Sequence, residues 1–127
     1  AIEAWSEIWF NAGYVYGGLI ASLIDCHSTG TAAAAKYRAE GREMDTEPSF
    51  RFLTASLHVD YLRPTPLDCN LEIRGKIKEV KGRKVVVTSS LLADGVECAT
   101  GEVVAVQVTD SFLEELIQSA ETEHDAD

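Results

Sequence analysis

A single carboxylate, Asp25, stands in a segment that is otherwise almost wholly apolar or small. Residues 16–25 read Tyr-Gly-Gly-Leu-Ile-Ala-Ser-Leu-Ile-Asp, and small residues recur as far as Ala35. Small or apolar side chains on nearly every face predict a helix that is buried all round. Moving an ionised carboxylate out of water costs several kcal/mol of free energy unless the group is paired or hydrogen-bonded. Asp25 is therefore expected either to be held by a structural network or to serve in chemistry.

The start of this helix carries a second signal. Gly17-Gly18 opens the helix, which is predicted to run to about Ala39 before Gly41 stops it. Glycines at a helix start leave backbone N–H groups unpaired at the positive end of the helix dipole, ready for an oxyanion or a carbonyl oxygen. Asp25 lies eight residues further on, or about 12 Å along the axis. If both groups act in one reaction, two subunits must share the site, which predicts an isologous dimer.

Length and charge restrict the class of protein. The 127 residues, 46% of them hydrophobic and 25% charged, suffice for one core and not for two. No apolar run is long enough for a transmembrane helix or placed as a secretory signal, so a membrane partner is not expected. The chain begins at Ala1 rather than Met, so residues upstream are expected to be missing. The formal charge of −10 argues against nucleic acid as a partner.

The cysteines indicate a reducing compartment. Cys26, Cys69 and Cys98 are odd in number and lack the spacing of a zinc site, which favours reduced thiols in the cytoplasm and no bound metal. The neighbours Cys26 and His27 could form a nucleophile and its base. Adjacent residues on a helix point about 100° apart, so this pairing is disfavoured.

The rest of the chain reads as strands. Residues 2–10 are rich in aromatic and β-favouring side chains and predict a first strand that ends at a turn beginning with Asn11. Residues 53–61 alternate strictly, with an apolar face that includes Leu57 and a polar face that includes Thr54 and His58. Strands at 71–80 and 84–92 are joined by a tight turn, and Asp94-Gly95 is a type I′ hairpin signal before a last strand at 96–108. This order predicts an α+β fold with an antiparallel sheet packed on one helix.

The end of the chain is predicted to lie outside that domain. Residues 1–109 form the expected domain, and residues 110–120 a short C-terminal helix opened by a capping box of Ser111 and Glu114. Residues 121–127 carry four acidic side chains without apolar periodicity and read as a disordered tail.

The order of elements, the Gly-Gly pair followed after six residues by Asp25, and the strand Thr-Ala-Ser-Leu-His-Val-Asp-Tyr-Leu-Arg-Pro resemble the hotdog-fold acyl-CoA thioesterases, in particular the phenylacetate-pathway (PaaI-like) branch. The resemblance covers nearly the whole chain from about Trp5 to Val108. It implies a hotdog fold, in which an antiparallel sheet of five to six strands wraps around one long buried helix. It also implies a homodimer or homotetramer with active sites at the subunit interface.

The resemblance also implies roles for individual residues. Asp25 would be the general base or nucleophile, the Gly17 N–H would polarise the thioester carbonyl, and Thr54 would assist. Asn11 corresponds to an Asn that the family has ahead of the glycine pair, with a spacing one residue short. Tyr16 stands where the family has His, and cannot carry that residue's positive charge. The remaining expected substrate contacts come from the glycine pair, the polar strand face and the basic residues: Gly18, His58, Arg63, Lys81, Arg83 and Lys84.

The predicted function is hydrolysis of an acyl-CoA to the free acid and CoA, with no cofactor beyond the coenzyme A of the substrate. Plain structural roles stay open for several of these residues. Tyr16 can be a packing aromatic, Thr54 and His58 can be polar-face residues, and the basic turn can be a solvated hairpin. Two other functions stay open as well, namely a non-catalytic acyl-CoA-binding protein and an enoyl-thioester hydratase or dehydratase. The acyl group itself, set by interface side chains and by the loop at residues 42–50, cannot be predicted.

Overall fold

The computed structural model describes residues 13–44, 46–47 and 49–126. Its elements run in the order α2 (Gly17–Ala39), β1 (Arg51–Tyr61), β2 (Leu71–Lys81), β3 (Lys84–Ala93), β4 (Val96–Val108) and α3 (Asp110–Ala126). The predicted long helix and the four strands that follow it are therefore confirmed. The strand expected at residues 2–10 lies outside the described residues.

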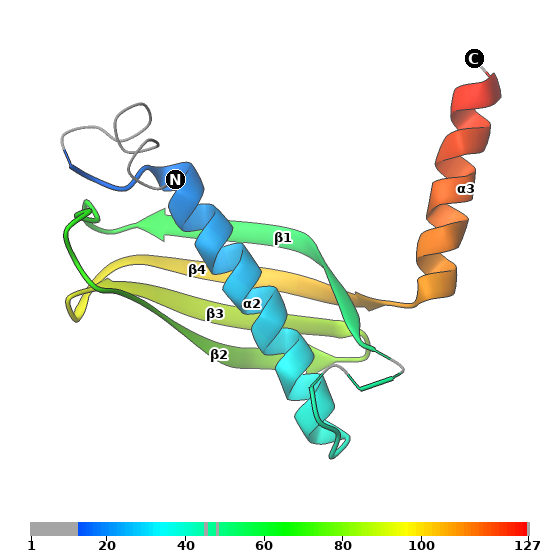
Figure 1. Ribbon diagram of the computed structural model, residues 1–127, viewed down its shortest axis with the longest axis horizontal. Helices are drawn as coiled ribbons and strands as arrows, with labels where there is room; N and C mark the ends of the chain where they lie inside the picture. Colours follow the sequence, from blue (N-terminus) through cyan, green and yellow to red (C-terminus); the bar gives the residue numbers. More distant parts are fainter. Residues whose placement is uncertain (1–12, 45, 48, 127) are drawn as a thin grey trace.

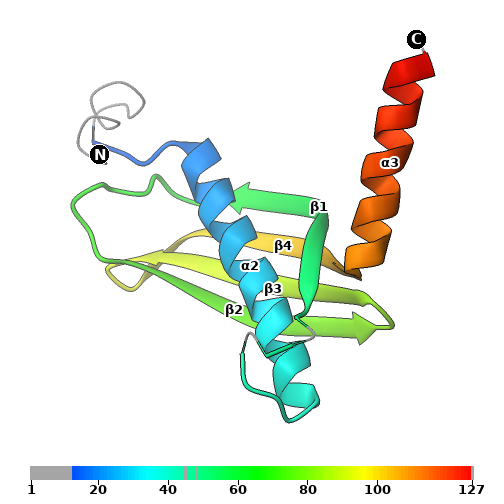
Figure 2. The same ribbon diagram turned by 45° about the vertical axis from the view of Figure 1, so that its right-hand side comes forward.

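The described strands form one antiparallel sheet in the order β1-β4-β3-β2. The five to six strands implied by the resemblance are thus four in the described part of the chain, and both β1 and β2 have a neighbour on one side only. Helix α2 crosses one face of this sheet, while α3 projects away from it (Figures 1 and 2). The architecture is a two-layer α+β domain with an appended helix.

The core lies between α2 and the sheet. Ile20 and Ile24 pack against Leu91, Ala99 and Val103 in one cluster. Ala32 packs against Val85, Val87 and Ala105 in a second. Between the two clusters, the buried hydroxyls of Ser28 and Ser89 hydrogen-bond each other at 2.8 Å. Successive steps of four residues along α2 thus supply the side chains that cover the sheet.

The composition of α2 predicts burial on all sides, but the helix is buried on one side only. Ile20, Ile24, Ser28, Ala32 and Tyr37 are buried, whereas the opposite side exposes Gly18, Ser22, Cys26, His27 and Gly30. One sheet covers one side of a helix, and the small residues on the other side have no cover among the described elements. Asp25 borders this open side and is half-buried.

Two turns follow the sequence signals closely. Asp94 and Gly95 have φ values of 48° and 83°, which is the pair of positive angles that a type I′ turn requires. Gly41, at φ 68°, follows the end of α2, where a left-handed residue commonly terminates a helix.

The C-terminal helix differs from expectation at both ends. Its cap is Thr109, whose hydroxyl accepts the Phe112 N–H at 3.1 Å, rather than the predicted Ser111. The helix also continues past residue 120 to Ala126, through most of the segment expected to be a disordered tail. The Thr122 hydroxyl donates to the Gln118 carbonyl in this part of the helix.

Candidate active site

Asp25 is joined to strand β1 by a short hydrogen bond. The Thr54 hydroxyl donates to Asp25 Oδ1 at 2.6 Å, across a gap of 29 residues in the sequence. Both side chains lie at the margin of the α2–sheet contact, where Asp25 is half-buried and Thr54 is exposed. A carboxylate held by one hydroxyl keeps its other lone pairs free to accept a proton from water or to attack a carbonyl carbon.

A β-bulge is what brings Thr54 to this face. The pairing of β1 with β4 shifts between Thr54, opposite Ala105, and Ser56, opposite Val104. Thr54 therefore shares the helix-facing side with Leu57 and Val59, which pair with Val103 and Gly101. The strict alternation predicted from the sequence, with Thr54 and His58 on one polar face, is wrong because of this extra residue.

The helix start offers a second group for chemistry. Gly17 is the first residue of α2, its N-cap is Tyr16, and no side chain caps the first turn. The first turn also contains no acidic residue. Backbone N–H groups at such a start carry partial positive charge and suit an oxygen that gains negative charge. The ring of Tyr16 packs so close to Gly18 that a Cβ added there would lie 2.9 Å from Tyr16 Cε2.

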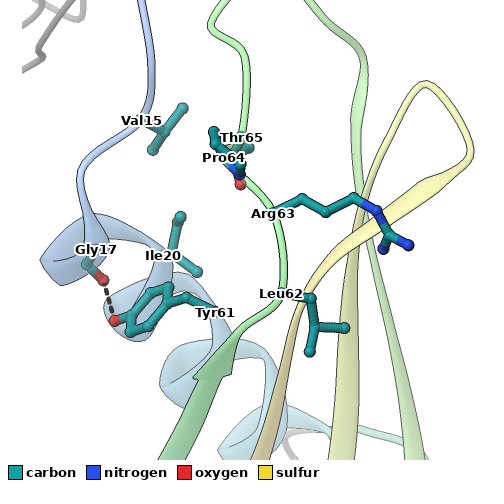
Figure 3. Close-up of a pocket in the computed structure, with 8 residues that line it drawn as sticks. All are labelled: Val15, Gly17, Ile20, Tyr61, Leu62, Arg63, Pro64 and Thr65. Atoms are coloured by element: carbon teal, nitrogen blue, oxygen red, sulfur yellow. Dashed lines mark hydrogen bonds between the residues drawn. The ribbon is translucent and has the colours of Figure 1, made fainter.

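A surface pocket of about 310 Å³ opens beside this helix start (Figure 3). Its walls come from the entry to α2 and from the segment that follows β1: Val15, Gly17, Ile20, Tyr61, Leu62, Arg63, Pro64 and Thr65. Arg63 is tied to β4 by a bond from its Nη1 to the Glu97 carbonyl at 2.6 Å. The pocket thus contains the N-terminus of α2, which no side chain caps, together with apolar walls and the Arg63 guanidinium.

Tyr61 is a site residue that the sequence did not reveal. Its hydroxyl donates to the Gly17 carbonyl at 2.7 Å, as Figure 3 shows. Its ring also covers Gly17, since a Cβ on that residue would lie 3.1 Å from Tyr61 Cζ and Oη. The only available signal was the position of Tyr61 at the end of a strand that runs into Pro64, which does not indicate a partner 44 residues away.

The two halves of the predicted site do not meet within one chain. Gly17 and Asp25 are both in α2, and eight residues of helix separate them by about 12 Å along the axis. The structure therefore brings together Asp25 with Thr54, and Gly17 with Tyr61 and Arg63, as two separate groups.

The other predicted residues lie further away. His58 pairs with Glu102 in the register, contacts Asp60 at 3.2 Å and lines a polar hollow on the sheet face opposite α2. Lys81, Arg83 and Lys84 are exposed at the turn between β2 and β3. This turn and Thr54 lie at the same end of the sheet, because Lys84 pairs with Val106 and Thr54 with Ala105. Asn11 lies outside the described residues.

Cys69 and Glu72, which do not belong to the site, have shifted pKa values. A hydrogen bond from the Cys69 thiol to Asp94 and the negative charge of that carboxylate raise the pKa of Cys69. The Arg74 guanidinium lowers the pKa of Glu72 through a hydrogen bond and charge attraction.

In the described part of the chain, no cluster of three or more His, Cys, Asp or Glu side chains is arranged to hold a metal ion. No helix within it is long and apolar enough to cross a membrane.

The helix-on-sheet arrangement is that of a hotdog fold. It superimposes on a hot-dog-like protein from Thermanaerovibrio acidaminovorans with a TM-score of 0.69, covering 92% of this chain and 79% of that one at 15% identity. The sequence model of the Thioesterase superfamily matches residues 12–99. The chain therefore belongs to the thioesterase superfamily.

Individual relatives agree with this assignment. A thioesterase superfamily protein from Shewanella loihica is 52% identical, with a TM-score of 0.61 over 76% of this chain and 71% of that one. A Thermus thermophilus thioesterase, complexed with coenzyme A and Zn, has a TM-score of 0.58 at 21% identity over 77% of this chain and 73% of that one. Acyl-coenzyme A thioesterase THEM4 of Xenopus laevis is 38% identical over 79 residues, which are 62% of this chain and 30% of that protein. The match thus spans less than a third of this curated relative.

Proposed function

We propose that this protein is an acyl-CoA thioesterase of the PaaI-like branch, acting in the cytoplasm as a homodimer or a dimer of dimers. The observation that carries the proposal is the 2.6 Å hydrogen bond from Thr54 to Asp25, which orients a half-buried carboxylate beside a polar donor. Membership of the thioesterase superfamily supports the reaction type. The acyl-coenzyme A thioesterase THEM4 relatives and the coenzyme A complex of the Thermus thermophilus protein support the substrate class.

The reaction follows from the two groups at the site. The N–H of Gly17 binds the thioester oxygen and stabilises the charge that develops there. Asp25 accepts a proton from a water whose oxygen attacks the carbonyl carbon, or it attacks that carbon itself and water releases the acyl group afterwards. The C–S bond breaks, and the thiol of CoA leaves with a proton. Thr54 holds the carboxylate in the orientation that either route needs.

The separation of Gly17 from Asp25 supports a site shared by two subunits. Strand β1 is an edge of the sheet in the described part of the chain, so its outer N–H and C=O groups are available for a second copy. Exposed Leu53 and Leu57 add apolar surface to this edge. Antiparallel pairing of two β1 strands about a two-fold axis near Leu57 would put Thr54 of one copy beside Tyr61 of the other. Tyr61 contacts Gly17, so each Asp25 would face the Gly17 of the second copy.

Basic residues supply the expected contacts with coenzyme A. Arg63 lines the pocket beside Gly17, and Lys81, Arg83 and Lys84 lie at the same end of the sheet as Thr54. We assign the thioester end of the substrate to Gly17, Gly18 and Tyr16, and its phosphates to these basic side chains. His58 has a place in this scheme only on the outer face of the sheet, away from the reacting carbonyl.

Thiol release from short, medium and aromatic acyl-CoAs tests the activity. The parent protein is compared with Asp25→Asn and with Asp68→Asn, an exposed aspartate outside the site that serves as the matched control. We expect turnover in the parent and in the control and its loss in Asp25→Asn at unchanged oligomeric mass. Full turnover in Asp25→Asn on every substrate that the parent hydrolyses would overturn the assignment.

Mixing two inactive variants tests the shared site. Hybrid dimers of Asp25→Asn and Gly17→Val subunits would combine the intact Asp25 of one subunit with the intact Gly17 of the other. Random exchange after unfolding and refolding should restore about a quarter of the parent activity, because half of the dimers are hybrids with one intact site of two. Sites built within single chains would regain nothing.

A non-catalytic acyl-CoA-binding protein is the second candidate. Tyr16 replaces the histidine of the family, and its ring is packed against Gly18 rather than offering a cation. Saturable binding of an acyl-CoA in calorimetry, with no thiol released over hours, would favour this function over hydrolysis.

A further inference from the structure

The contact between Tyr61 and Gly17 has a geometry that bears on the helix start. The Tyr61 hydroxyl donates to the Gly17 carbonyl at 2.7 Å, and that carbonyl belongs to the peptide unit whose N–H is on Gly18. A donor on the carbonyl side of a peptide unit fixes the plane of that unit and polarises its N–H, so the N–H becomes a better donor in turn. The bond therefore acts on an amide that points out of the uncapped end of α2.

The ring of Tyr61 adds a steric constraint to this bond. A Cβ on Gly17 would lie 3.1 Å from both Tyr61 Cζ and Tyr61 Oη, closer than most such contacts in proteins. Gly17 thus leaves room for the ring, and the ring covers the helix start from the side of the pocket (Figure 3). The position of Tyr61 is set independently, because the next two residues donate their N–H groups to the Cys98 carbonyl at 2.9 and 3.1 Å.

We infer that Tyr61 is a positioning residue for the Gly17–Gly18 peptide, holding the Gly18 N–H so that it receives the thioester oxygen together with the N–H of Gly17. This inference rests on the proposed thioesterase function. Tyr61 acts through the backbone. Its hydroxyl should therefore stabilise the transition state mainly, in which the thioester oxygen gains negative charge. It should change kcat more than the binding of the ground-state substrate.

Removal of the hydroxyl with the ring retained tests this role. Tyr61→Phe should lower kcat by about three- to tenfold, the effect of one neutral hydrogen bond, and leave KM within about twofold. Tyr14→Phe is the matched control, since Tyr14 is exposed at the entry to the same helix and has no assigned role in the site. Its kcat and KM should equal those of the parent. Thermal unfolding of both variants shows whether any loss follows from stability alone.

A double-mutant cycle makes the test specific for the contact. The added methyl in Gly17→Ala would make the Tyr61 ring shift by a few tenths of an ångström, so the hydroxyl bond should already be weakened in this variant. Tyr61→Phe in the Gly17→Ala background should then lower kcat by less than twofold further. Independent, multiplicative losses from the two substitutions would overturn the positioning role.

The results separate this inference from the proposed function. If the parent is active and Asp25→Asn is inactive while Tyr61→Phe matches Tyr14→Phe, the thioesterase stands and the role of Tyr61 is overturned. If the parent releases no thiol, both are overturned.

The position of the Gly18 amide signal in ¹⁵N-resolved NMR spectra gives a readout besides activity. It should move in Tyr61→Phe and stay in place in Tyr14→Phe.

Discussion

Thr54 and Asp25 link the edge strand to the long helix, with 2.6 Å between the Thr54 hydroxyl and Asp25 Oδ1. The bond is made on the helix-facing side of β1, at a bulge that places a hydroxyl among apolar neighbours. The chemistry proposed for Asp25 depends on this orientation.

Thr54→Val should therefore reduce turnover while the fold is kept, because it removes the only described side-chain donor to Asp25 and changes little in shape. A hydrogen bond to a charged group predicts a fall of roughly ten- to hundredfold in kcat. Thr54→Ser retains the hydroxyl and should keep most of the activity. Steady-state thiol release measures both, and equal activity of Thr54→Val and the parent would remove Thr54 from the mechanism.

Gly101→Ala should destabilise the domain. A Cβ at Gly101 would lie 2.5 Å from Ile24 Cγ2, in the middle of the core. Such overpacking costs about 1–3 kcal/mol of unfolding free energy. Gly30→Ala is the matched control, since nothing lies within 4 Å of its Cβ position on the exposed side of α2. This second change should stabilise the helix by up to about 1 kcal/mol, so urea unfolding should show shifts of opposite sign.

Thr65→Val should leave stability unchanged or raise it by up to about 1 kcal/mol, in contrast to most substitutions of buried polar residues. The Thr65 hydroxyl is buried and has no hydrogen-bond partner among the residues that the structure describes. Replacing it by a methyl removes a desolvated group while the shape is preserved. A lower melting temperature in Thr65→Val would reveal a partner, such as a bound water, in solution.

Alkylation of Cys69 should accelerate when the charge of Asp94 is removed. The thiol donates a hydrogen bond to that carboxylate, and the carboxylate also repels the thiolate; both effects raise the pKa of Cys69. Less thiolate is therefore present at a given pH near 8 than in a free cysteine, and alkylation follows the thiolate. Asp94→Asn keeps a residue that tolerates the positive φ of the turn and should increase the rate of iodoacetamide labelling. Peptide mass spectrometry gives the rate at Cys69, and an unchanged rate would exclude this coupling.

The apolar residues of α3 should contribute little to the stability of the domain. Leu116 and Ile117 are exposed, and α3 has no extended packing with the other described elements. We expect Ile117→Ser to change the unfolding free energy by less than about 0.5 kcal/mol. Ile24→Ala, in the fully buried core, should cost about 2–5 kcal/mol in the same thermal assay. A marked loss in Ile117→Ser would mean that α3 is packed against another surface in solution.

The sequence predicts most of the described backbone, and of the candidate site it names Asp25 and Thr54, which the structure brings into contact. Gly17-Gly18, Gly41 and Asp94-Gly95 are local signals, so the bounds of α2 and the last hairpin are confirmed. Burial of α2 on all sides is not seen, because the residue types do not reveal how many layers cover a helix. The contact of Tyr61 with Gly17 could not be predicted, since it depends on where the end of β1 lies relative to the start of α2.

The bulge in β1 also decides which side chain of the strand lies beside Asp25. It divides the strand into two halves of opposite parity, so that Thr54 and Leu57 face the same way although an odd number of positions separates them. In a regular strand that keeps Ala55, Thr54 would turn to the outer face, and Leu53 and Ala55 would share the helix-facing side with Leu57. Deletion of Ala55 would instead leave Thr54 two positions before Leu57 and on the same face, so whether a hydroxyl or an apolar side chain lies beside Asp25 depends on how the strand accommodates this one residue.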